Sequence, residues 1–298
     1  MLARDFETFS SLVKAETGLA ISPDKAYLLE ARLAPVALKW NFSTIEQLAE
    51  ALRNRQNAAQ VRDVAEAMTI NESQFFRDAK PFDLLRDNIL PALLAARAVK
   101  RRLRIWSAAC SSGQEAYSIA ILLQECGNLA GWTIDIVGTD ISTEMVERAR
   151  AGIYTSFEIQ RGMPAKLLVK HFARVGEKWQ IAESVRHTVQ FKRQNLLHDL
   201  TPLGTYDIVF CRNVLIYFDL ATKAKVLAAL HRQMPEDGYL VLGAAETVIG
   251  ITNVFAQSPG LPGVYVPSNP NAGPAAASVN CQARARAFTI TTLRESNM

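Results

Sequence analysis

One stretch constrains the fold of this chain more than any other: an apolar run from Ile105 leads into small residues and then into a helix that reaches Ser118. The small residues 110–113 would let the backbone approach a bound ligand closely, and the first amide hydrogens of the helix would point at that ligand. Loops that bind a pyrophosphate usually avoid a nearby acid, yet Glu115 stands in the first helical turn. We therefore expect a nucleotide-like cofactor whose cationic end faces Glu115.

A second strand supports the same site. Residues 134–139 form an apolar run that ends in Asp140. A carboxylate at the end of a buried parallel strand can accept hydrogen bonds from both ribose hydroxyls of a nucleotide. Because its methionyl portion carries an ammonium and a sulfonium, S-adenosylmethionine fits the two acids better than a dinucleotide does. The chain also lacks the G-x-G-x-x-G motif of dinucleotide-binding proteins.

The alternation of apolar runs predicts an α/β fold from Leu103 onward. Short strands and helices alternate there, which is typical of a doubly wound, Rossmann-like parallel sheet. The strands are expected at 103–107, 133–139, 206–211 and 238–243, and the helices at 115–126, 142–150 and 220–234.

Three further segments complete the expected organisation. Residues 1–90 show helical periodicity and no strand pattern, which predicts an N-terminal all-α domain. The sheet domain would span 91–266 and carry a small inserted β-subdomain at about 154–192, with strand-like pieces at 178–182 and 188–191. The tail 267–298 is rich in Pro, Asn, Ala, Ser and Gly, and is expected to be disordered.

Composition excludes several classes of protein. With 298 residues, 49% of them hydrophobic, the chain can bury a large core. No apolar run approaches the roughly 20 residues of a membrane span, and acids occupy the start where a signal peptide would be apolar, so a cytoplasmic protein without membrane insertion is expected. Five of the eight residues from Arg97 to Arg104 are basic. No nucleic-acid-binding motif accompanies them, so we expect no nucleic-acid partner and interpret them as a solvated edge or an attractor of acidic partners.

Cysteine and histidine usage predicts neither disulfides nor a metal site. The cysteines lack C-x-x-C spacing and are interpreted as reduced thiols, and the histidines lack ligand spacing. These residues are Cys110, Cys126, Cys211 and Cys281, and His171, His187, His198 and His231.

Four separated blocks together resemble one family. From about Asp5 to Val266 the chain resembles the CheR family of chemotaxis receptor glutamate methyltransferases. The blocks are Thr69 to Arg77, Trp106 to Ser118, Gly138 to Ser142, and Phe210 to Phe218. The resemblance implies methylation of glutamate γ-carboxylates on the cytoplasmic signalling domains of chemotaxis receptors, with S-adenosylmethionine as cofactor, S-adenosylhomocysteine as product and no metal. The short loop between Phe172 and Trp179 indicates receptor binding without a C-terminal pentapeptide tether, and we expect a monomer.

The resemblance also implies roles for particular residues. Arg77 would pair the methionyl carboxylate and contribute to catalysis, Glu115 would face the amino-acid end of the cofactor, and Asp140 would bind the ribose. Other cofactor contacts implied by position are Asn71 and Ser73 beside Arg77, Asn195 and Leu196 around the adenine, and Asn213 and Val214 near the transferred methyl group.

Some of these residues have structural alternatives. Asn195 could simply form a turn. Arg212 and Tyr217 are candidates for orienting the substrate carboxylate, but packing and structural pairing explain them equally well. Three other functions also stay open at this point: a methyltransferase of the same fold acting on a small molecule or RNA, a non-catalytic S-adenosylmethionine sensor, and a dinucleotide-dependent oxidoreductase.

Overall fold

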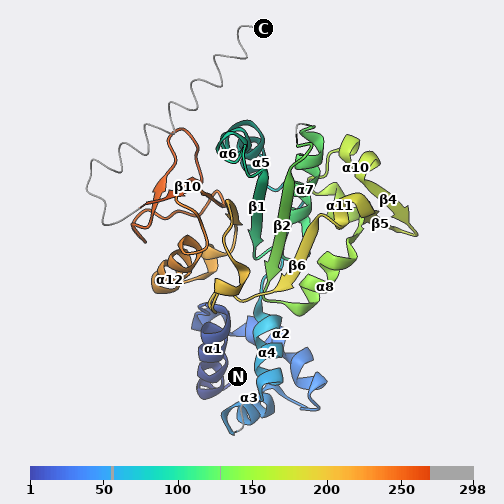
Figure 1. Ribbon diagram of the computed structural model, residues 1–298. Helices are drawn as coiled ribbons and strands as arrows, with labels where there is room; N and C mark the ends of the chain where they lie inside the picture. Colours follow the sequence, from blue (N-terminus) through green and yellow to red (C-terminus); the bar gives the residue numbers. More distant parts are fainter. Residues whose placement is uncertain (55–56, 128, 269–298) are drawn as a thin grey trace.

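Residues 1–54, 57–127 and 129–268, which the computed structural model describes, contain a seven-stranded central sheet of order β6-β2-β1-β7-β8-β10-β9 (Figure 1). In chain order its strands are β1 (Arg102–Ala108), β2 (Thr133–Asp140), β6 (Val189–Arg193), β7 (Ile208–Cys211), β8 (Tyr239–Leu242), β9 (Phe255–Gln257) and β10 (Val264–Pro267). The five strands from β6 to β8 are mutually parallel. This arrangement confirms the predicted doubly wound α/β sheet.

The two strands at one edge depart from the all-parallel expectation. β10 pairs antiparallel with β8 and with β9. A parallel neighbour needs a crossover of a dozen or more residues, whereas β9 and β10 are separated only by the turns of residues 258–263. The short connection therefore forces the chain to reverse.

The order of the strands creates a switch point beside β1. After β1 the chain adds β2 and then β6 on one side, and afterwards β7 and β8 on the other. Loops that leave β1 and β7 at their carboxyl ends consequently diverge, and ligands of open α/β sheets bind in such a crevice. In Figure 1 the carboxyl ends of β1 and β2 point toward the N-terminal helices.

Both faces of the sheet are covered. Along β1, Ile105 packs with residues of α7 (Gln114–Glu125) and α8 (Thr143–Ala151). The next residue, Trp106, faces the opposite side and packs with residues of α12 (Leu220–His231). Side chains alternate along a strand, so the continuous apolar run that β1 contributes fills two cores.

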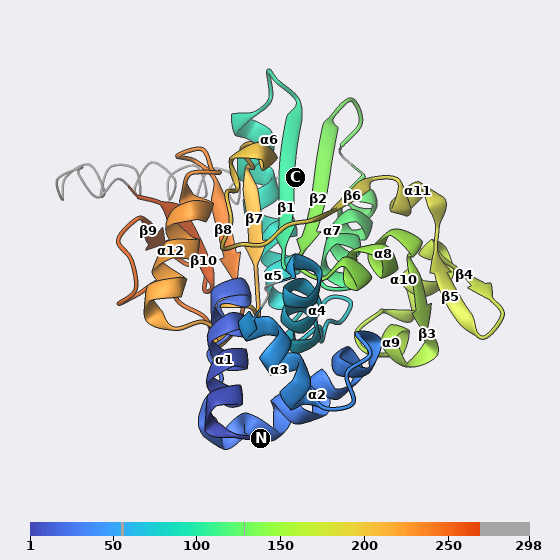
Figure 2. The same cartoon turned by 90° about the horizontal axis from the view of Figure 1, so that it is seen from below.

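The N-terminal helices have a core of their own. They are α1 (Ala3–Thr17), the short 3₁₀ turn η1 (Pro23–Lys25), α2 (Ala26–Lys39), α3 (Ile45–Asn54) and α4 (Ala58–Met68). Phe9, Leu29, Leu48 and Val64, one from each helix, are fully buried together. Seen from below, these helices cover the carboxyl edge of the sheet (Figure 2).

The next helical segment packs with the sheet instead. It consists of α5 (Lys80–Leu84), a π-helical turn η2 (Leu85–Ile89) and α6 (Leu90–Ala96). Phe82, Leu85 and Ile89 lie in the same core as the strands. We therefore propose a domain boundary within residues 69–79 in place of the one expected at residue 90, because periodicity reveals a helix but not the surface against which it packs.

A small antiparallel sheet follows α8. Its order is β3-β5-β4, with β3 (Ile153–Thr155), β4 (Phe172–Val175) and β5 (Lys178–Ile181), and the helices α9 (Ser156–Gln160), α10 (Ala165–His171) and α11 (Glu183–Arg186) accompany it. The prediction that the strand at 188–191 belongs to this inserted region is wrong. That segment is β6, which pairs with β2 in the central sheet, since it returns to the sheet after α11.

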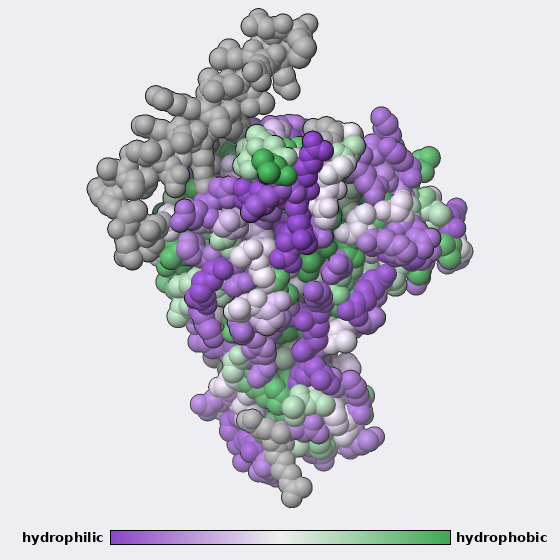
Figure 3. Space-filling model, viewed as in Figure 1, coloured by the Kyte–Doolittle hydropathy of each residue, from purple (hydrophilic) through white to green (hydrophobic). Residues whose placement is uncertain are grey.

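Short 3₁₀ turns, η3 (Thr201–Leu203) and η4 (Leu215–Tyr217), flank β7. The tail expected to be disordered lies outside the described residues from 269 on. Hydrophilic side chains dominate the face seen in Figure 3, and none of the helices within the described ranges has both the length and the apolarity to cross a bilayer.

Much of the basic stretch from Arg97 to Arg104, which runs into β1, is paired. Arg97 forms ion pairs with Asp207 and Asp237, and Arg102 forms one with Asp135. These contacts favour a structural role for the stretch over a role in attracting acidic partners.

Candidate functional site

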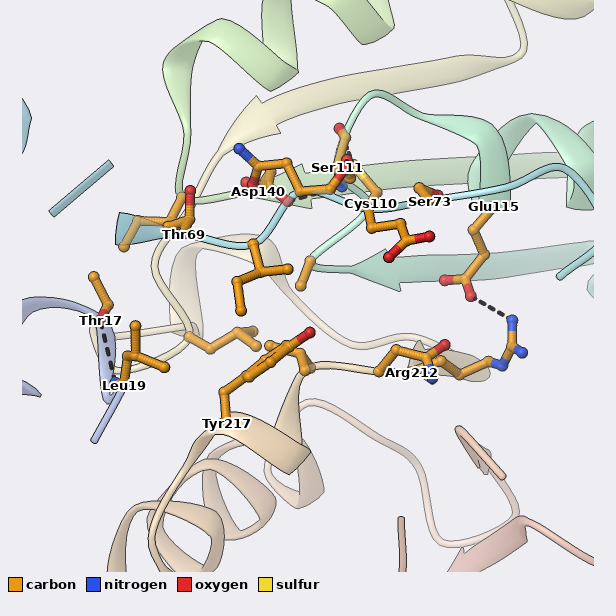
Figure 4. Close-up of a pocket in the computed structure, with 18 of the residues that line it drawn as sticks. Thr17, Leu19, Thr69, Ser73, Cys110, Ser111, Glu115, Asp140, Arg212 and Tyr217 are labelled. Carbon is orange, nitrogen blue, oxygen red and sulfur yellow. Dashed lines mark hydrogen bonds and ion pairs between the residues drawn. The ribbon is translucent and has the colours of Figure 1, made fainter. Parts of the chain in front are cut away.

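A cavity of ≈ 1000 Å³, counting its open mouth, lies at the carboxyl edge of the sheet. Its lining comes from the loops after β1, β2, β6 and β7 and from the N-terminal helices. Figure 4 shows Asp140, Ser111 and Cys110 on one wall and Tyr217 opposite, with Thr17 and Leu19 at one end and Glu115 and Arg212 at the other.

The loop after β1 has an unusual backbone. Ala109, Ser111 and Gly113 all have positive φ, at 56°, 52° and 92°. Only glycine fits at 113, because a Cβ there would lie 2.9 Å from the Cβ of Ala149. Non-glycine residues in this conformation are strained, and such strain concentrates at ligand sites. The loop thereby turns its backbone toward the cavity, as the run of small residues predicted.

Asp140 stands at the end of β2 and is 5% exposed. Its Oδ2 accepts a hydrogen bond from the backbone N–H of Ser111 at 2.8 Å, and its Oδ1 accepts one from that of Ser142 at 2.9 Å. Burial raises the pKa of this carboxyl, and the backbone donors oppose the rise. Two oxygens offer about four acceptor sites, so the carboxylate can still accept hydrogen bonds from a ligand's hydroxyls.

A three-residue ionic cluster occupies the other end of the cavity. Arg212, whose side chain is 1% exposed, donates to Glu115 at 2.9 Å and to Asp78 at 2.7 Å. Glu115 also accepts a hydrogen bond from the hydroxyl of Ser107 at 2.8 Å. Two carboxylates share one guanidinium, so the cluster keeps one net negative charge. This charge suits a ligand's ammonium or sulfonium, whereas the contacts of Arg212 support its structural-pairing alternative.

The segment from Asn71 to Arg77 lines the cavity between the helical domain and the sheet. The backbone carbonyl of Asn71 accepts a hydrogen bond from the Ser111 hydroxyl at 2.7 Å, and Ser73 lines the same wall. Arg77 donates one long hydrogen bond, 3.3 Å, to the carbonyl of Glu72. Among the described residues its guanidinium has no carboxylate within ion-pair distance, which leaves it available to an anionic group.

Phe75 anchors this segment in the inserted subdomain. It is fully buried and makes edge-to-face contacts with Tyr154 and Phe172, at centroid distances of 4.9 and 5.5 Å. Tyr154 in turn donates a hydrogen bond from its hydroxyl to the carbonyl of Ser112, in the loop after β1, at 2.8 Å. A Cβ at Gly162 would lie 2.0 Å from the Phe75 carbonyl oxygen, so this approach requires glycine. The inserted subdomain thus supports two walls of the cavity.

Asn195 and Leu196 follow β6 and line the cavity, but the Asn195 amide is already engaged. Its Oδ1 accepts a hydrogen bond from the backbone N–H of Leu197 at 2.9 Å, and its Nδ2 donates to the carbonyl of Glu16 at 2.6 Å. The first bond is the turn-forming role considered as an alternative. The second links the loop to the end of α1.

The loop after β7 carries three more predicted residues. Asn213 adopts a left-handed conformation, with φ 60°, and lines the cavity together with Val214 and Tyr217. Tyr217 is half-buried, and its hydroxyl makes no hydrogen bond to any described residue. The hydroxyl is therefore free to contact a substrate, which is the orienting role that the sequence suggested.

The cysteines beside the site are unsuited to nucleophilic catalysis. Cys110 lines the cavity and Cys211 ends β7, and both are buried. Burial raises the pKa of each thiol well above its usual value, so both stay protonated and unreactive. Cys126 is a free thiol as well, and Cys281 lies outside the described residues.

Sequence reasoning missed several residues of the site, and four of them stand out by their place or their contacts. Thr17 and Leu19 close one end of the cavity, Asp78 completes the ionic cluster, and Ser111 holds Asp140 and Asn71 together. Ser111 lies within one of the four sequence blocks and Asp78 directly follows another, so both could have been proposed as polar residues of those blocks. Nothing in the α1 pattern signals that its end reaches a cavity in another domain.

The charged groups that line the cavity match the chemical groups of S-adenosylmethionine. Asp140 can accept hydrogen bonds from a ribose, the net negative cluster around Glu115 can face a cation, and Arg77 can pair a carboxylate. A dinucleotide would instead bring its pyrophosphate toward Glu115, where like charges repel.

Comparisons with known proteins agree along most of the chain. The family model described as CheR methyltransferase, SAM binding domain, matches residues 71–263, and the one described as CheR methyltransferase, all-alpha domain, matches residues 4–69. A chemotaxis protein methyltransferase of Vibrio parahaemolyticus is 36% identical over 267 residues, which are 88% of this chain and 95% of that protein. Chemotaxis protein methyltransferase 1 of Pseudomonas aeruginosa is 35% identical over 266 residues, covering 87% and 96%.

Proposed function

Because the chain belongs to the CheR methyltransferase family, we propose that it methylates glutamate side chains on the cytoplasmic signalling domains of chemotaxis receptors. The cofactor is S-adenosylmethionine, and the products are a glutamate γ-methyl ester and S-adenosylhomocysteine. Family membership confirms the resemblance seen in the four sequence blocks. Loss of the glutamate charge would then tune the signalling state of the receptor.

The observation that carries the proposal is the layout of charge along one cavity. Asp140 lies on one wall, and the Glu115, Arg212 and Asp78 cluster lies at the end remote from Thr17 and Leu19. A ribose on Asp140 would place the adenine toward the helical domain and the sulfonium toward the cluster. Arg77 would pair the methionyl carboxylate.

When bound, S-adenosylmethionine supplies an electrophilic methyl group: a glutamate oxygen bonds to the methyl carbon as the carbon–sulfur bond breaks, and that bond's electron pair stays on sulfur. A glutamate side chain has a pKa of about 4.3 and is ionised near neutral pH, so it needs no general base. The protein's task is to align the reacting groups, an effect of up to about 7–11 kcal/mol in favourable systems. Tyr217, whose hydroxyl makes no hydrogen bond to a described residue, would donate it to the second oxygen of the substrate carboxylate.

The receptor contact is also part of the proposal. The β4–β5 connection consists of two residues, Gly176 and Glu177. A hairpin this short supports receptor binding without a C-terminal pentapeptide tether. The proposed substrate implies a cytoplasmic location.

One assay tests the function. Purified protein, radiolabelled S-adenosylmethionine and isolated receptor signalling domains should give protein-bound label that mild base releases as methanol, the signature of a carboxyl ester. Asp140→Ala should lose labelling at limiting cofactor, because it removes the ribose contact. Base-stable label, label on RNA, or cofactor binding without any transfer would each contradict the proposal and favour one of the rival functions.

A further inference from the structure

Glu246 lies in the loop after β8, outside the cavity lining that the described residues define, and its carboxylate holds the neighbouring loop. Oε2 accepts hydrogen bonds from the backbone N–H groups of Asn213 and Gly243, each at 2.8 Å. Oε1 accepts them from Val214 at 2.9 Å and Ile216 at 3.3 Å. One side chain therefore binds three of the four amides from residue 213 to 216, directly after β7.

The burial of Glu246 makes these bonds costly to lose. The residue is 8% exposed and has no cationic partner within the described ranges. A buried carboxylate needs compensating donors, and hydrogen bonds between a charged group and backbone N–H groups are among the stronger ones. The four amides supply that compensation, so the position of the carboxylate and the conformation of the loop depend on each other.

Gly243 provides independent support for this arrangement. A Cβ at residue 243 would lie 2.7 Å from Oε2 of Glu246 and 3.0 Å from Nδ2 of Asn213. The φ of Gly243 is not positive, so backbone conformation does not demand glycine there. The space that Glu246 needs to reach the loop explains this glycine.

We infer that Glu246 is a positioning residue for methyl transfer, which holds Asn213 in its left-handed conformation and fixes Val214 and Tyr217 against the reacting groups. The inference rests on the proposed function. Asparagine tolerates the left-handed region better than most non-glycine residues do, and the hydrogen bond from the Asn213 backbone N–H to the Glu246 carboxylate holds it there. Without it, the loop relaxes and the wall of the cavity opposite Asp140 moves.

The test is a single-turnover measurement on Glu246→Gln. The amide keeps the side chain's shape but replaces one acceptor oxygen with an NH₂ that faces backbone donors. At saturating labelled S-adenosylmethionine, the first-turnover rate on receptor domains should fall by ~10²-fold, the size expected for a displacement of about 1 Å in a reacting group. Glu246→Asp keeps the charge and should recover part of the rate. The matched control is Glu50→Gln on α3, an exposed carboxylate that should leave the rate unchanged.

The outcomes separate positioning from stability. Circular dichroism and a thermal melt give the folded fraction, and the rate is expressed per folded, cofactor-loaded molecule. A Glu246→Gln protein that is less stable but turns over at the wild-type rate overturns the inference. If that variant does not fold, Glu246→Asp decides: a reduced rate supports positioning, and a wild-type rate overturns it. Failure of the wild-type protein to label receptors would instead remove the proposed function, and this inference with it.

Discussion

Individual charged residues decide which part of a ligand meets which part of the cavity. Asp140 is held by two backbone donors and is almost completely buried, so its carboxylate has one orientation. Glu115 is held by Arg212 and Ser107. Arg77 has no such partner in the described parts of the chain, which makes it the most available cation of the site. These differences lead to two predictions.

Replacing Arg77 should weaken the binding of S-adenosylhomocysteine. Arg77→Ala removes a charge-assisted hydrogen bond to the amino-acid carboxylate, and such bonds contribute about 1.5–3 kcal/mol. We expect the dissociation constant to rise by roughly 10- to 100-fold, measured by calorimetry, and methyl transfer to be lost. Arg77→Lys should bind with intermediate affinity, since a lysine cannot make the two parallel bonds of a guanidinium. Unchanged affinity in both variants would contradict the assignment of Arg77.

Cofactor binding should depend on the protonation of Asp140. Burial raises the pKa of its carboxyl, so as the pH falls Asp140 is protonated earlier than an ordinary aspartate. The neutral form loses the charge that favours the ribose hydroxyls, and S-adenosylhomocysteine should therefore bind more weakly on acidification, at a higher pH than a normal carboxyl would produce. Calorimetry across pH measures this effect. Asp140→Asn should bind weakly with a flatter pH profile, and an identical profile would rule Asp140 out as the titrating group.

At the scale of elements, the short segment between β2 and α8 both holds the Asp140 carboxylate and caps the helix. Ser142 ends the turn after β2 with its backbone N–H on Asp140, and it begins α8 by accepting the N–H of Met145 on its hydroxyl, at 3.3 Å. Gly152 ends the same helix in a left-handed conformation. The caps define where α8 begins and ends, and the N-terminal cap residue also holds the Asp140 carboxylate.

Removing the α8 cap should cost stability while sparing the site. Ser142→Ala deletes the hydroxyl acceptor, which typically lowers the free energy of unfolding by ~1 kcal/mol, but it keeps the backbone donor to Asp140. We expect a lower midpoint in urea and little change in cofactor affinity. Ser142→Thr, which retains an acceptor, is the control. A large loss of affinity in Ser142→Ala would mean that the hydroxyl itself belongs to the site.

For the whole molecule, the docking of the helical domain onto the sheet completes the cavity. Glu66 on α4 accepts hydrogen bonds from the N–H and the hydroxyl of Thr143 at the start of α8, at 3.0 and 2.9 Å, and it pairs with Arg193 at 3.4 Å. Arg32 on α2 donates to the carbonyls of residues 68 and 69. The end of α1 meets the loop after β7 through a bridge between Leu19 and Phe218.

Breaking the contact between α4 and α8 should loosen this docking. Glu66→Ala removes hydrogen bonds in which one partner is charged, each worth about 1.5–3 kcal/mol, and leaves every residue of the cavity lining in place. We expect weaker binding of S-adenosylhomocysteine and earlier unfolding of the helical domain in a calorimetric scan. Glu50→Ala, an exposed change on α3, should alter neither. Wild-type affinity in Glu66→Ala would show that docking does not limit binding.

The sequence by itself determined the main strands and helices of the parallel sheet and the two acids after β1 and β2. Strand periodicity, small residues and a helix start are local features, so they are enough to locate the loop after β1, Glu115 and Asp140 without knowledge of any tertiary contact. The position of each strand's carboxyl end follows from the parallel fold, and this is why Glu115 and Asp140 were expected at one edge, whereas Arg77, Asn195 and Leu196 were expected from the family resemblance alone.

Only the tertiary structure decided which residues pair with one another. Glu115 and Arg212 are separated by 97 positions, Asn195 and Glu16 by 179, and Glu246 and Asn213 by 33. Such contacts depend on how helices and loops pack after the chain has crossed the sheet, and no local pattern encodes them. For the same reason the helical pattern of residues 1–90 did not show that α5 packs in the sheet core, and the strand pattern at 188–191 did not show that β6 belongs to the central sheet.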